Sequence, residues 1–360
     1  MKNFDEIFID KTKYGVKVQV AEYGERGKYV IIDQGQDQIA GYTNREEGLF
    51  KEVPVIIFGD HTRVIKYVDE PFFLGADGVK VLRSKDNNAN YKYLYYALKN
   101  AKIPNTGYNR HFKWLKEVCI KYPKREEQDM IVDILDNVSA IIYKRKDELS
   151  KLDNLIKARF VEMFGDPISN PKGYKKEAIE KHIDLLSGYP FKSEQYVDKG
   201  INICGGLIIM PQKIKWEECV HWESTDGYED YLLNENDIVM ALDRPWIAEG
   251  FKIAKIDANH LPALLIQRTA RIRALDLNQD YLYYCFINGG FDRHSNVTGS
   301  LVPHISAKDI RSFKVMLPPI ELQNQFADFV RAVDKSKVKV QKALDETQKL
   351  FDSLMQQYFG

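Results

Sequence analysis

The sequence predicts an α+β protein in which two mixed α/β domains are separated by two long antiparallel coiled-coil helices, as a pseudo-two-fold repeat. Three observations predict this fold. One stretch of the chain recurs without gaps, each copy carries apolar residues at heptad spacing, and the remaining segments hold short β-branched and aromatic runs. The 360 residues are enough for two domains, because a typical domain has roughly 100–200 residues.

The internal repeat consists of residues 122–165 and 317–360, which align without a gap at an offset of 195 residues. Both copies end in Phe-Gly. Identical residues recur at Pro123 and Pro318, Glu126 and Glu321, Gln128 and Gln323, Asp133 and Asp328, Val138 and Val333, Leu149 and Leu344, and Leu155 and Leu350. A long repeat indicates a duplicated structural unit, so the chain is predicted to be a covalent pseudo-dimer of domain plus helix.

Each copy is predicted to be one long helix with defined ends. A proline precedes it, Glu126 or Glu321 lies in the first turn, where the helix dipole favours negative charge, and a glycine follows it. Apolar residues alternate at steps of three and four, the pattern of a coiled coil. The predicted helix-pairing seam comprises Ile131, Leu135, Val138, Ile142, Leu149, Leu152, Ile156, Phe326, Val330, Val333, Val340, Leu344, Phe351 and Leu354. The obvious partner for each seam is the other copy.

The predicted boundaries are residues 1–121 and 166–316 for the two domains, and 122–165 and 317–360 for the helices. Short apolar runs at 53–58, 79–82, 237–240 and 270–273, separated by Gly, Asn and Asp turns, predict strands of twisted sheets. Each domain then carries Tyr-Leu-Tyr-Tyr, at 93–96 and 281–284, followed by Thr-Gly and a histidine, His111 or His304. We expect the stretch at 281–284 to be a packed helix face and Cys285 a core thiol.

Composition narrows the class of protein. The chain has 52 basic and 52 acidic residues, whereas a protein that coats nucleic acid is basic, so any DNA binding must be local. Residues 1–118 hold 19 Lys and Arg against 16 Asp and Glu, and residues 166–316 hold 18 against 21. The four cysteines lie far apart without a CxxC pair, which is typical of reduced thiols in a cytoplasm. The sequence contains no run of about 18 apolar residues, so it predicts no membrane span. Acidic residues near the N-terminus argue against a secretory leader.

Sequence motifs for catalysis are missing. The chain has no GxxxxGK[ST] or GxGxxG, no Asn-Pro-Pro-aromatic tetrapeptide, and no Glu-x-Lys triplet. Its seven histidines include no HxH or HExxH spacing, which argues against a metal site. The sequence therefore predicts a non-catalytic chain that binds no metal or cofactor of its own.

The arrangement of domains and helices resembles the specificity subunit of type I restriction–modification systems, over the whole chain. The main motifs are Leu-Pro-Pro-Ile-Glu-Leu-Gln at 317–323, Phe-Ala-Asp-Phe-Val at 326–330 and Tyr-Phe-Gly at 358–360. The first domain adds motifs at 33–36, 40–42, 58–63 and 73–78, and the second at 296–300 and 304–306. The first copy departs from the family pattern at Lys124-Arg125, where a second proline or an apolar residue is more usual.

The resemblance implies that each domain is a target-recognition domain that reads half of a bipartite double-stranded DNA target, while the helices hold the halves apart. It also implies docking of two methyltransferase subunits, which recruit restriction subunits, in a cytoplasmic complex. Those partners are expected to use S-adenosylmethionine, ATP and magnesium. Because the two domains differ outside their shared landmarks, we expect an asymmetric target.

The candidate base contacts of the first domain form a polar, turn-rich stretch. The candidate residues of this stretch are Gln34, Gln36, Gln38, Asn44 and Arg45. Their side chains suit base edges, because glutamine can pair with adenine and arginine with guanine. The alternative is a solvated loop. His61, Thr62 and Arg63 follow a predicted buried strand, a position that favours function, with Arg63 as a candidate phosphate contact. The alternative there is a structural turn in which Asp60 caps its own backbone.

The candidate DNA contacts of the second domain are more dispersed. They are Lys192, Arg244, Arg293, His294, Asn296, Thr298 and Ser300. Arg244 is predicted either to pair with Trp246 as a DNA-contacting guanidinium–aromatic unit or to cover a core tryptophan. The stretch 293–300 supplies small donors whose backbone can approach a phosphate closely.

Two other functions are compatible with parts of the pattern. A coiled-coil interaction scaffold with two protein-binding heads would share the helices but bind no DNA. The recognition part of a single-chain endonuclease–methylase would share the domains, and the missing catalytic motifs argue against it.

Overall fold

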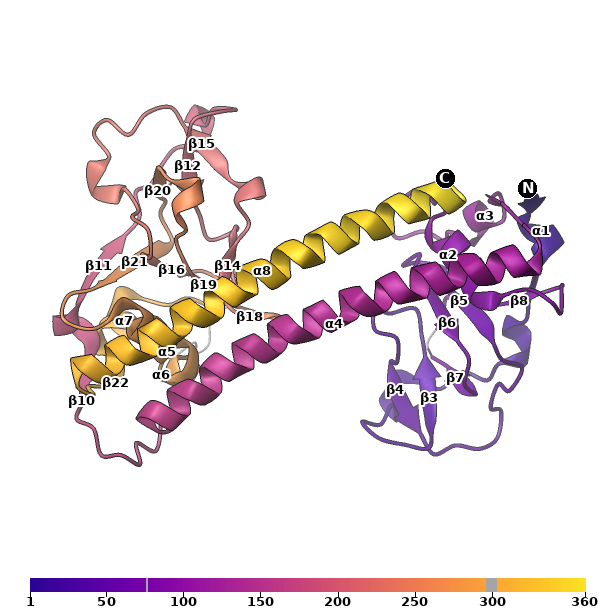
Figure 1. Cartoon of the computed structure of the whole chain (residues 1–360), viewed down its shortest axis with the longest axis horizontal. Helices are drawn as coiled ribbons and strands as arrows, with labels where there is room; N and C mark the ends of the chain where they lie inside the picture. Colours follow the sequence, from indigo (N-terminus) through magenta and orange to yellow (C-terminus); the bar gives the residue numbers. More distant parts are fainter. Residues whose placement is uncertain (76, 296–302) are drawn as a thin grey trace. The chain divides into compact units, whose positions relative to one another are not determined.

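The computed structural model describes residues 1–75, 77–295 and 303–360, which form two compact units (Figure 1). The first unit contains Met1–Asp147 and Gln341–Gly360, and the second contains Glu148–Val340. Both long helices, α4 (Arg125–Phe164) and α8 (Ile320–Phe359), contribute to each unit. The fold is therefore α+β, as the sequence predicts, with the repeated helices shared between two mixed domains.

The first unit holds two main sheets, a two-stranded sheet and short helices. Its strands are β1 (Lys2–Asn3), β2 (Phe8–Asp10), β3 (Tyr29–Ile32), β4 (Gly41–Thr43), β5 (Val55–Gly59), β6 (Ile65–Val68), β7 (Phe72–Leu74), β8 (Val79–Ser84) and β9 (Cys119–Ile120). Its short helices are α1 (Phe4–Ile7), α2 (Tyr91–Lys99) and α3 (Phe112–Leu115). Strands β2-β8-β5-β6 form an antiparallel sheet, β4-β3-β7 form a second sheet in which β3 and β7 are parallel, and β1 pairs with β9.

The second unit repeats this plan with additional short strands. They are β10 (Lys176–Ala178), β11 (Ile183–Ser187), β12 (Ile201–Cys204), β13 (Ile209–Met210), β14 (Lys213–Ile214), β15 (Val220–Trp222), β16 (Ile238–Ala241), β17 (Trp246–Ile247), β18 (Gly250–Phe251), β19 (Ile253–Lys255), β20 (Ala263–Leu265), β21 (Thr269–Ala274) and β22 (Lys314–Met316). The helices are α5 (Gln279–Asn288), α6 (Phe291–His294) and α7 (Ala307–Ser312). Sheets β11-β21-β16-β19 and β15-β12-β20 correspond in order and direction to the two main sheets of the first unit.

Alternation along the strands divides the core of the first unit into two layers. Ile56 and Phe58 of β5 face α2 and the start of α4, while Val55 and Ile57 face the three-stranded sheet. All four side chains are completely buried. Successive strand residues point to opposite faces, so a strand buried on both sides is apolar throughout. This explains why the run at 53–58 is continuous and not alternating.

The predicted packed face at 281–284 is confirmed in α5. Tyr281, Tyr283 and Tyr284 are buried, and Cys285 beside them is also buried. The ring of Tyr281 stacks on Phe160 of α4, with 5.8 Å between the centroids, and its hydroxyl donates to the carbonyl of Met316. Burial raises the pKa of the Tyr281 phenol. These tyrosines therefore belong to the core, where they cannot stack on a nucleic acid base.

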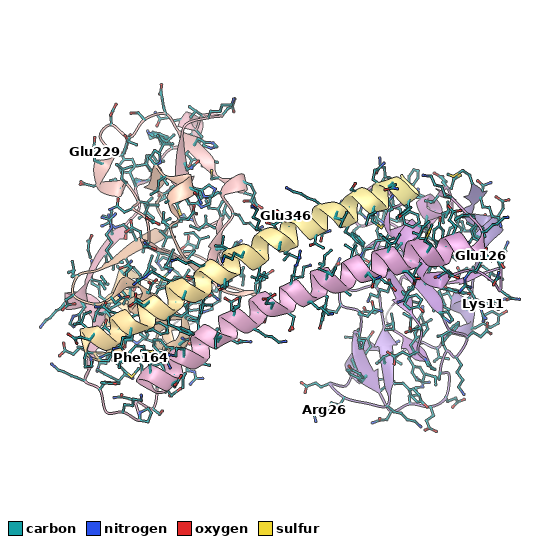
Figure 2. The ribbon with its side chains drawn as sticks, viewed as in Figure 1. Lys11, Arg26, Glu126, Phe164, Glu229 and Glu346 are labelled. Carbon is teal, nitrogen blue, oxygen red and sulfur yellow. The ribbon has the colours of Figure 1, made fainter. Side chains whose placement is uncertain are left out.

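The two long helices are antiparallel where they meet within each unit. In the first unit, Met355 near the end of α8 joins a core cluster with Ile131 near the start of α4. In the second, Phe326 near the start of α8 contacts Phe164 at the end of α4, a residue labelled in Figure 2. Every residue of the predicted helix-pairing seam is buried or half-buried. At the helix ends, the seam also packs against the domain cores, so the other helix is not its sole partner.

Among the described residues, no helix combines the length and the apolar character needed to cross a membrane.

Candidate DNA interface

Three chain segments converge beside the sheets of the first unit, each next to the end or the start of a strand. Residues 33–38 follow β3, residues 60–63 follow β5, and residues 77–78 precede β8. The amide of Asp60 donates to the carbonyl of Gly78 (2.7 Å), and the hydroxyl of Thr62 donates to the carbonyl of Gln34 (2.7 Å). The fold therefore brings Gln34 and the group His61, Thr62 and Arg63 to one place.

The side chain of Gln34 links these segments through hydrogen bonds. Its Nε2 donates to the carbonyl of Asp77 (2.8 Å), and its Oε1 accepts from the backbone amide of His61 (3.1 Å). Both ends of the side-chain amide are thus occupied by protein. A bidentate contact to adenine would use the same two groups, so these bonds favour a role for Gln34 in holding the loop in shape over a role in base readout.

The other predicted contacts of this stretch fall into two groups. Gln38 donates from Nε2 to the carbonyl of Tyr67 (2.7 Å), and the Oδ1 of Asn44 accepts from the amide of Lys28 (3.0 Å). Gln36 and Arg45 are exposed, and neither side chain has a hydrogen-bond partner among the described residues. Of the five, Gln36 and Arg45 are therefore the ones available to a base or phosphate.

An aromatic pair with one exposed ring lies beside this loop cluster. The ring of His61 stacks on Tyr108, with centroids 4.8 Å apart and planes inclined by 11°. Tyr108 is 88% exposed, and the Nδ1 of His61 is buried without a partner among the described residues. Tyr108 is not among the predicted contacts, because only the folded chain brings residue 108 back to the end of β5.

Arg63 is built into the fold. It has a positive φ of 61°, and its Nη1 donates to the carbonyl of Ile103 (3.3 Å). Its side chain is half-buried. The interpretation of Asp60 as a cap of its own turn is wrong, because its Oδ1 accepts from the amide of Phe112 at the start of α3 (2.7 Å). The geometry thus favours a structural role for Arg63 over a phosphate contact.

The predicted contacts of the second unit are scattered. Lys192 and Arg244 are exposed. Trp246 stacks on Phe251 with centroids 5.0 Å apart, and the cation–π contacts of the described residues do not include Arg244 with Trp246. The predicted pair of the Arg244 guanidinium with the Trp246 ring is therefore wrong.

Further along the second unit, Arg293 is exposed on α6. The Nε2 of His294 lies 3.1 Å from the carbonyl oxygen of Asp309 and 3.0 Å from the Oγ of Ser312, so His294 ties α6 to α7. The remaining predicted contacts, Asn296, Thr298 and Ser300, lie outside the described residues.

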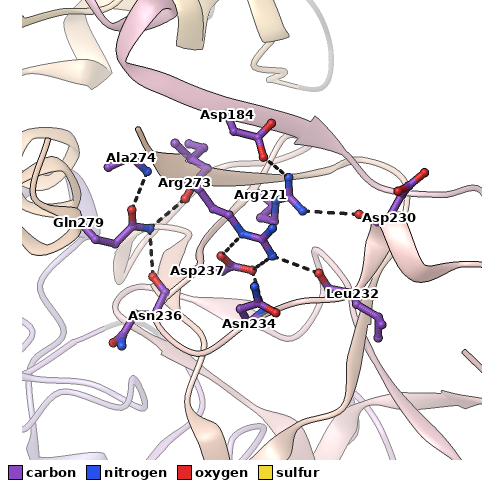
Figure 3. Close-up of polar contacts among 11 residues, drawn as sticks. Asp184, Asp230, Leu232, Asn234, Asn236, Asp237, Arg271, Arg273, Ala274 and Gln279 are labelled. Carbon is purple, nitrogen blue, oxygen red and sulfur yellow. Dashed lines mark hydrogen bonds and ion pairs between the residues drawn. The ribbon is translucent and has the colours of Figure 1, made fainter. Parts of the chain in front are cut away.

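Two arginines of β21 form an internal polar network (Figure 3). Arg273 makes a bidentate pair with Asp237 at 2.5 and 2.7 Å, and Arg271, which is buried, pairs with Asp184. Burial lowers the pKa of Arg271, whereas the hydrogen bonds of Asp237 raise the pKa of Arg273. Because their charges are matched internally, these arginines do not add to the surface potential of a domain that is already net acidic.

The second unit also has an open hollow that no sequence motif indicates. Its volume is about 570 Å³, and Leu207, Gln267 and Arg268 line it together with Arg244. Leu207 is 90% exposed. Within residues 1–75, 77–295 and 303–360, no group of three or more His, Cys, Asp or Glu side chains is placed to hold a metal ion.

The chain thus contains the same α/β unit twice, joined by shared helices, and the two units expose different side chains at matching loop ends. This arrangement is typical of a recognition protein with two separate binding domains. A family model described as the Type I restriction modification DNA specificity domain matches residues 2–151 and 188–347. The chain belongs to this family, and it is the non-catalytic specificity component of such a system.

Curated relatives agree with this assignment. The chain is 31% identical over 201 residues to the EcoAI specificity subunit of Escherichia coli, covering 52% of this chain and 33% of that protein. It is 26% identical to the EcoR124I/EcoR124II specificity subunit of E. coli, covering 90% of this chain and 83% of the relative. It is 25% identical to the MjaVIII specificity subunit of Methanocaldococcus jannaschii, covering 75% and 72%.

Solved structures share the fold. The S subunit of a type I restriction–modification system from M. genitalium superposes with a TM-score of 0.59 at 17% identity, covering 100% of this chain and 95% of that one. A chain from a structure of type I system assembly and conformational transition gives a TM-score of 0.50 at 14% identity, covering 100% and 99%.

Proposed function

We propose that the chain recognises a bipartite, asymmetric sequence in double-stranded DNA, with one half read by each globular domain. The observation that carries this proposal is a common backbone framework with contrasting side chains. Asp60 donates its amide to the carbonyl of Gly78 in the first unit, as Leu242 does to Arg268 in the second, at 2.7 and 2.9 Å. Two domains with equivalent backbones but different side chains are suited to recognising two different base sequences.

The proposal extends to the protein partners. The chain positions two methyltransferase subunits, and restriction subunits join through them, with S-adenosylmethionine, ATP and magnesium used by those partners. Exposed apolar residues support two equivalent docking positions, because they recur at the repeat offset. Leu155 and Leu350 are 47% and 51% exposed, and Tyr143 and Val338 are 73% and 68% exposed. In this proposal each repeat offers a methyltransferase subunit the same exposed apolar positions.

The alternative function, a scaffold with two protein-binding heads, predicts no methylated DNA motif. To separate the two, the chain is co-expressed with the methyltransferase subunit of its own system in a host without adenine methylation. Methylated adenines are then mapped across the genome. We expect one bipartite motif with two different halves. A complex that assembles but leaves the genome unmethylated would contradict the proposal.

Domain exchange tests the division of labour between the two readers. Replacing residues 166–316 with the corresponding segment of another family member should change only one half of the methylated motif, because the first unit keeps its own loops. The reciprocal exchange of residues 1–121 serves as the control and should change only the other half. If either exchange altered both halves, modular reading would be wrong.

A further inference from the structure

The hollow in the second unit is lined by Gly206, a glycine at a position where the first unit has a bulkier glutamine. The sheet pairings align Ile32 opposite Leu74 with Cys204 opposite Leu265. Counting on by two residues places Gly206 at the position of Gln34. In the first unit this space is filled, since a Cβ on Gly78 would lie 2.8 Å from both Gln34 and His61. In the second unit, the absence of a side chain at Gly206 leaves the space open.

Arg268 stands at the rim of this hollow in a backbone conformation that glycine prefers. Its φ is +62°, and the equivalent residue of the first unit is Gly78, with a φ of +90°. The equivalence is fixed by strand register, because Gly59 pairs with Val79 as Ala241 pairs with Thr269. A non-glycine residue in the left-handed region carries backbone strain. An arginine there, where glycine would be easier, indicates that its side chain is needed.

The backbone of Arg268 is anchored while its guanidinium remains accessible. Its carbonyl accepts from the amide of Leu242 (2.9 Å), and the amide of Gln267 donates to the carbonyl of Tyr189 (2.8 Å). The Arg268 side chain is 75% exposed, and its Nη1 lies 3.2 Å from Oδ2 of Asp243. The Oδ1 of Asp243 lies 2.7 Å from Nδ1 of His304. Asp243 is thus held by His304 and in turn orients the guanidinium of Arg268.

The surroundings fit the edge of a base pair better than a bare phosphate. A guanidinium held from one side keeps further N–H groups free for two parallel hydrogen bonds, which is how arginine recognises O6 and N7 of guanine. Gln267 is exposed beside it, and Leu207 offers an uncovered apolar side chain of the kind that contacts a thymine methyl group. A phosphate-binding cluster would need neither the leucine nor the restraining carboxylate.

We propose that Arg268 specifies a guanine in the DNA half read by the second unit, with Asp243 as its positioning residue. This inference rests on the proposed function, because it names the side chain that performs the reading. The hollow opened by Gly206 receives the base edges in the major groove.

Arg268→Gly is the sharpest test, because it installs the residue of the first unit and removes the side chain without adding backbone strain. The variant is assayed in complex with the methyltransferase subunit on a library of targets randomised in each half. We expect preference for guanine at one base pair of the second half to fall about 10-fold or more, as expected for a lost bidentate contact. The first half should stay unchanged. Arg311→Ala, an exposed arginine on α7 of the same unit, is the matched control and should keep the full motif.

Two further variants separate charge from geometry. Arg268→Lys keeps the charge but loses the planar fork, so it should retain the salt dependence of binding while losing guanine preference. Asp243→Asn should weaken the same preference to a smaller extent. An equal loss on all targets with a shallower salt dependence, or an unchanged motif in Arg268→Gly, would overturn the inference. If the unaltered complex methylated no bipartite motif, that result would instead contradict the proposed function itself.

Discussion

At the scale of single residues, one buried glutamine in each unit connects the globular domain to the start of a long helix. Gln323 accepts from the amide of Asn278 (2.9 Å) and donates to the carbonyl of Pro318 (2.9 Å). Gln128 makes the same two bonds in the first unit, to Asn90 and Pro123. Both glutamines are 2% exposed. The identity of these residues in the two repeats thus has a structural cause that is independent of DNA.

We expect Gln323→Leu to lower the free energy of unfolding by about 2 kcal/mol or more, because it leaves a buried amide and a buried carbonyl without partners. Denaturant unfolding of the full chain measures this difference. Gln325→Leu is the control, since Gln325 lies in the same helical turn and is exposed. Equal effects of the two substitutions would show that the hydrogen bonds of Gln323 contribute nothing specific.

At the scale of elements, polar residues interrupt the apolar seam between α4 and α8. The guanidinium of Arg145 donates to the carbonyl of Ala343 and the hydroxyl of Thr347. Lys337 in the second unit lies 2.6 Å from the Oδ1 of Asp153. A purely apolar seam permits several registers, whereas a buried polar contact is satisfied in one alone. We infer that these contacts fix the register of the antiparallel pair.

A double-mutant cycle tests the contact in the first unit. Arg145→Ala should cost roughly 1 kcal/mol of stability, and combining it with Thr347→Val should show a coupling energy of about 0.5 kcal/mol or more. Lys146→Ala, at an exposed neighbouring position, should be close to neutral and additive with Thr347→Val. Additivity of Arg145→Ala with Thr347→Val would mean that the register is set by the apolar residues alone.

The elements also show which features a sequence can reveal. The helices follow from heptad spacing and terminal Pro and Gly, because both are local properties of the chain. The availability of a loop residue depends on which distant segment returns beside it. The sequence presents Gln34 as a candidate base contact, whereas in the fold its amide bonds to the carbonyl of Asp77 and the amide of His61. Tyr108 and Arg268 carry no local signal. Tyr108 depends on its stacking against the distant His61, and Arg268 on the strand register that makes it the equivalent of Gly78.

At the scale of the whole molecule, the repeat suggests that helix length sets the unread spacer between the two DNA halves. Each long helix has 40 residues, which at about 1.5 Å per residue gives a rod of about 60 Å. Equivalent insertion points lie after residues 147 and 342, which are 195 apart in the repeat. Insertions there leave the contacts of Arg145 with residues 343 and 347 intact.

Inserting four residues at both points should lengthen the preferred spacer by about one or two base pairs, because the rod grows by roughly 6 Å and a base pair rises about 3.4 Å. Four residues exceed one helical turn by about 40°, so the apolar seam shifts only slightly. Seven residues restore the heptad register and add about 10 Å, so this second variant should shift the spacer by about three base pairs. Methylation of targets that differ only in spacer length measures both shifts, and each half-site should stay the same. If folded, active variants of both lengths still preferred the original spacer, something other than the helices would set the distance between the halves.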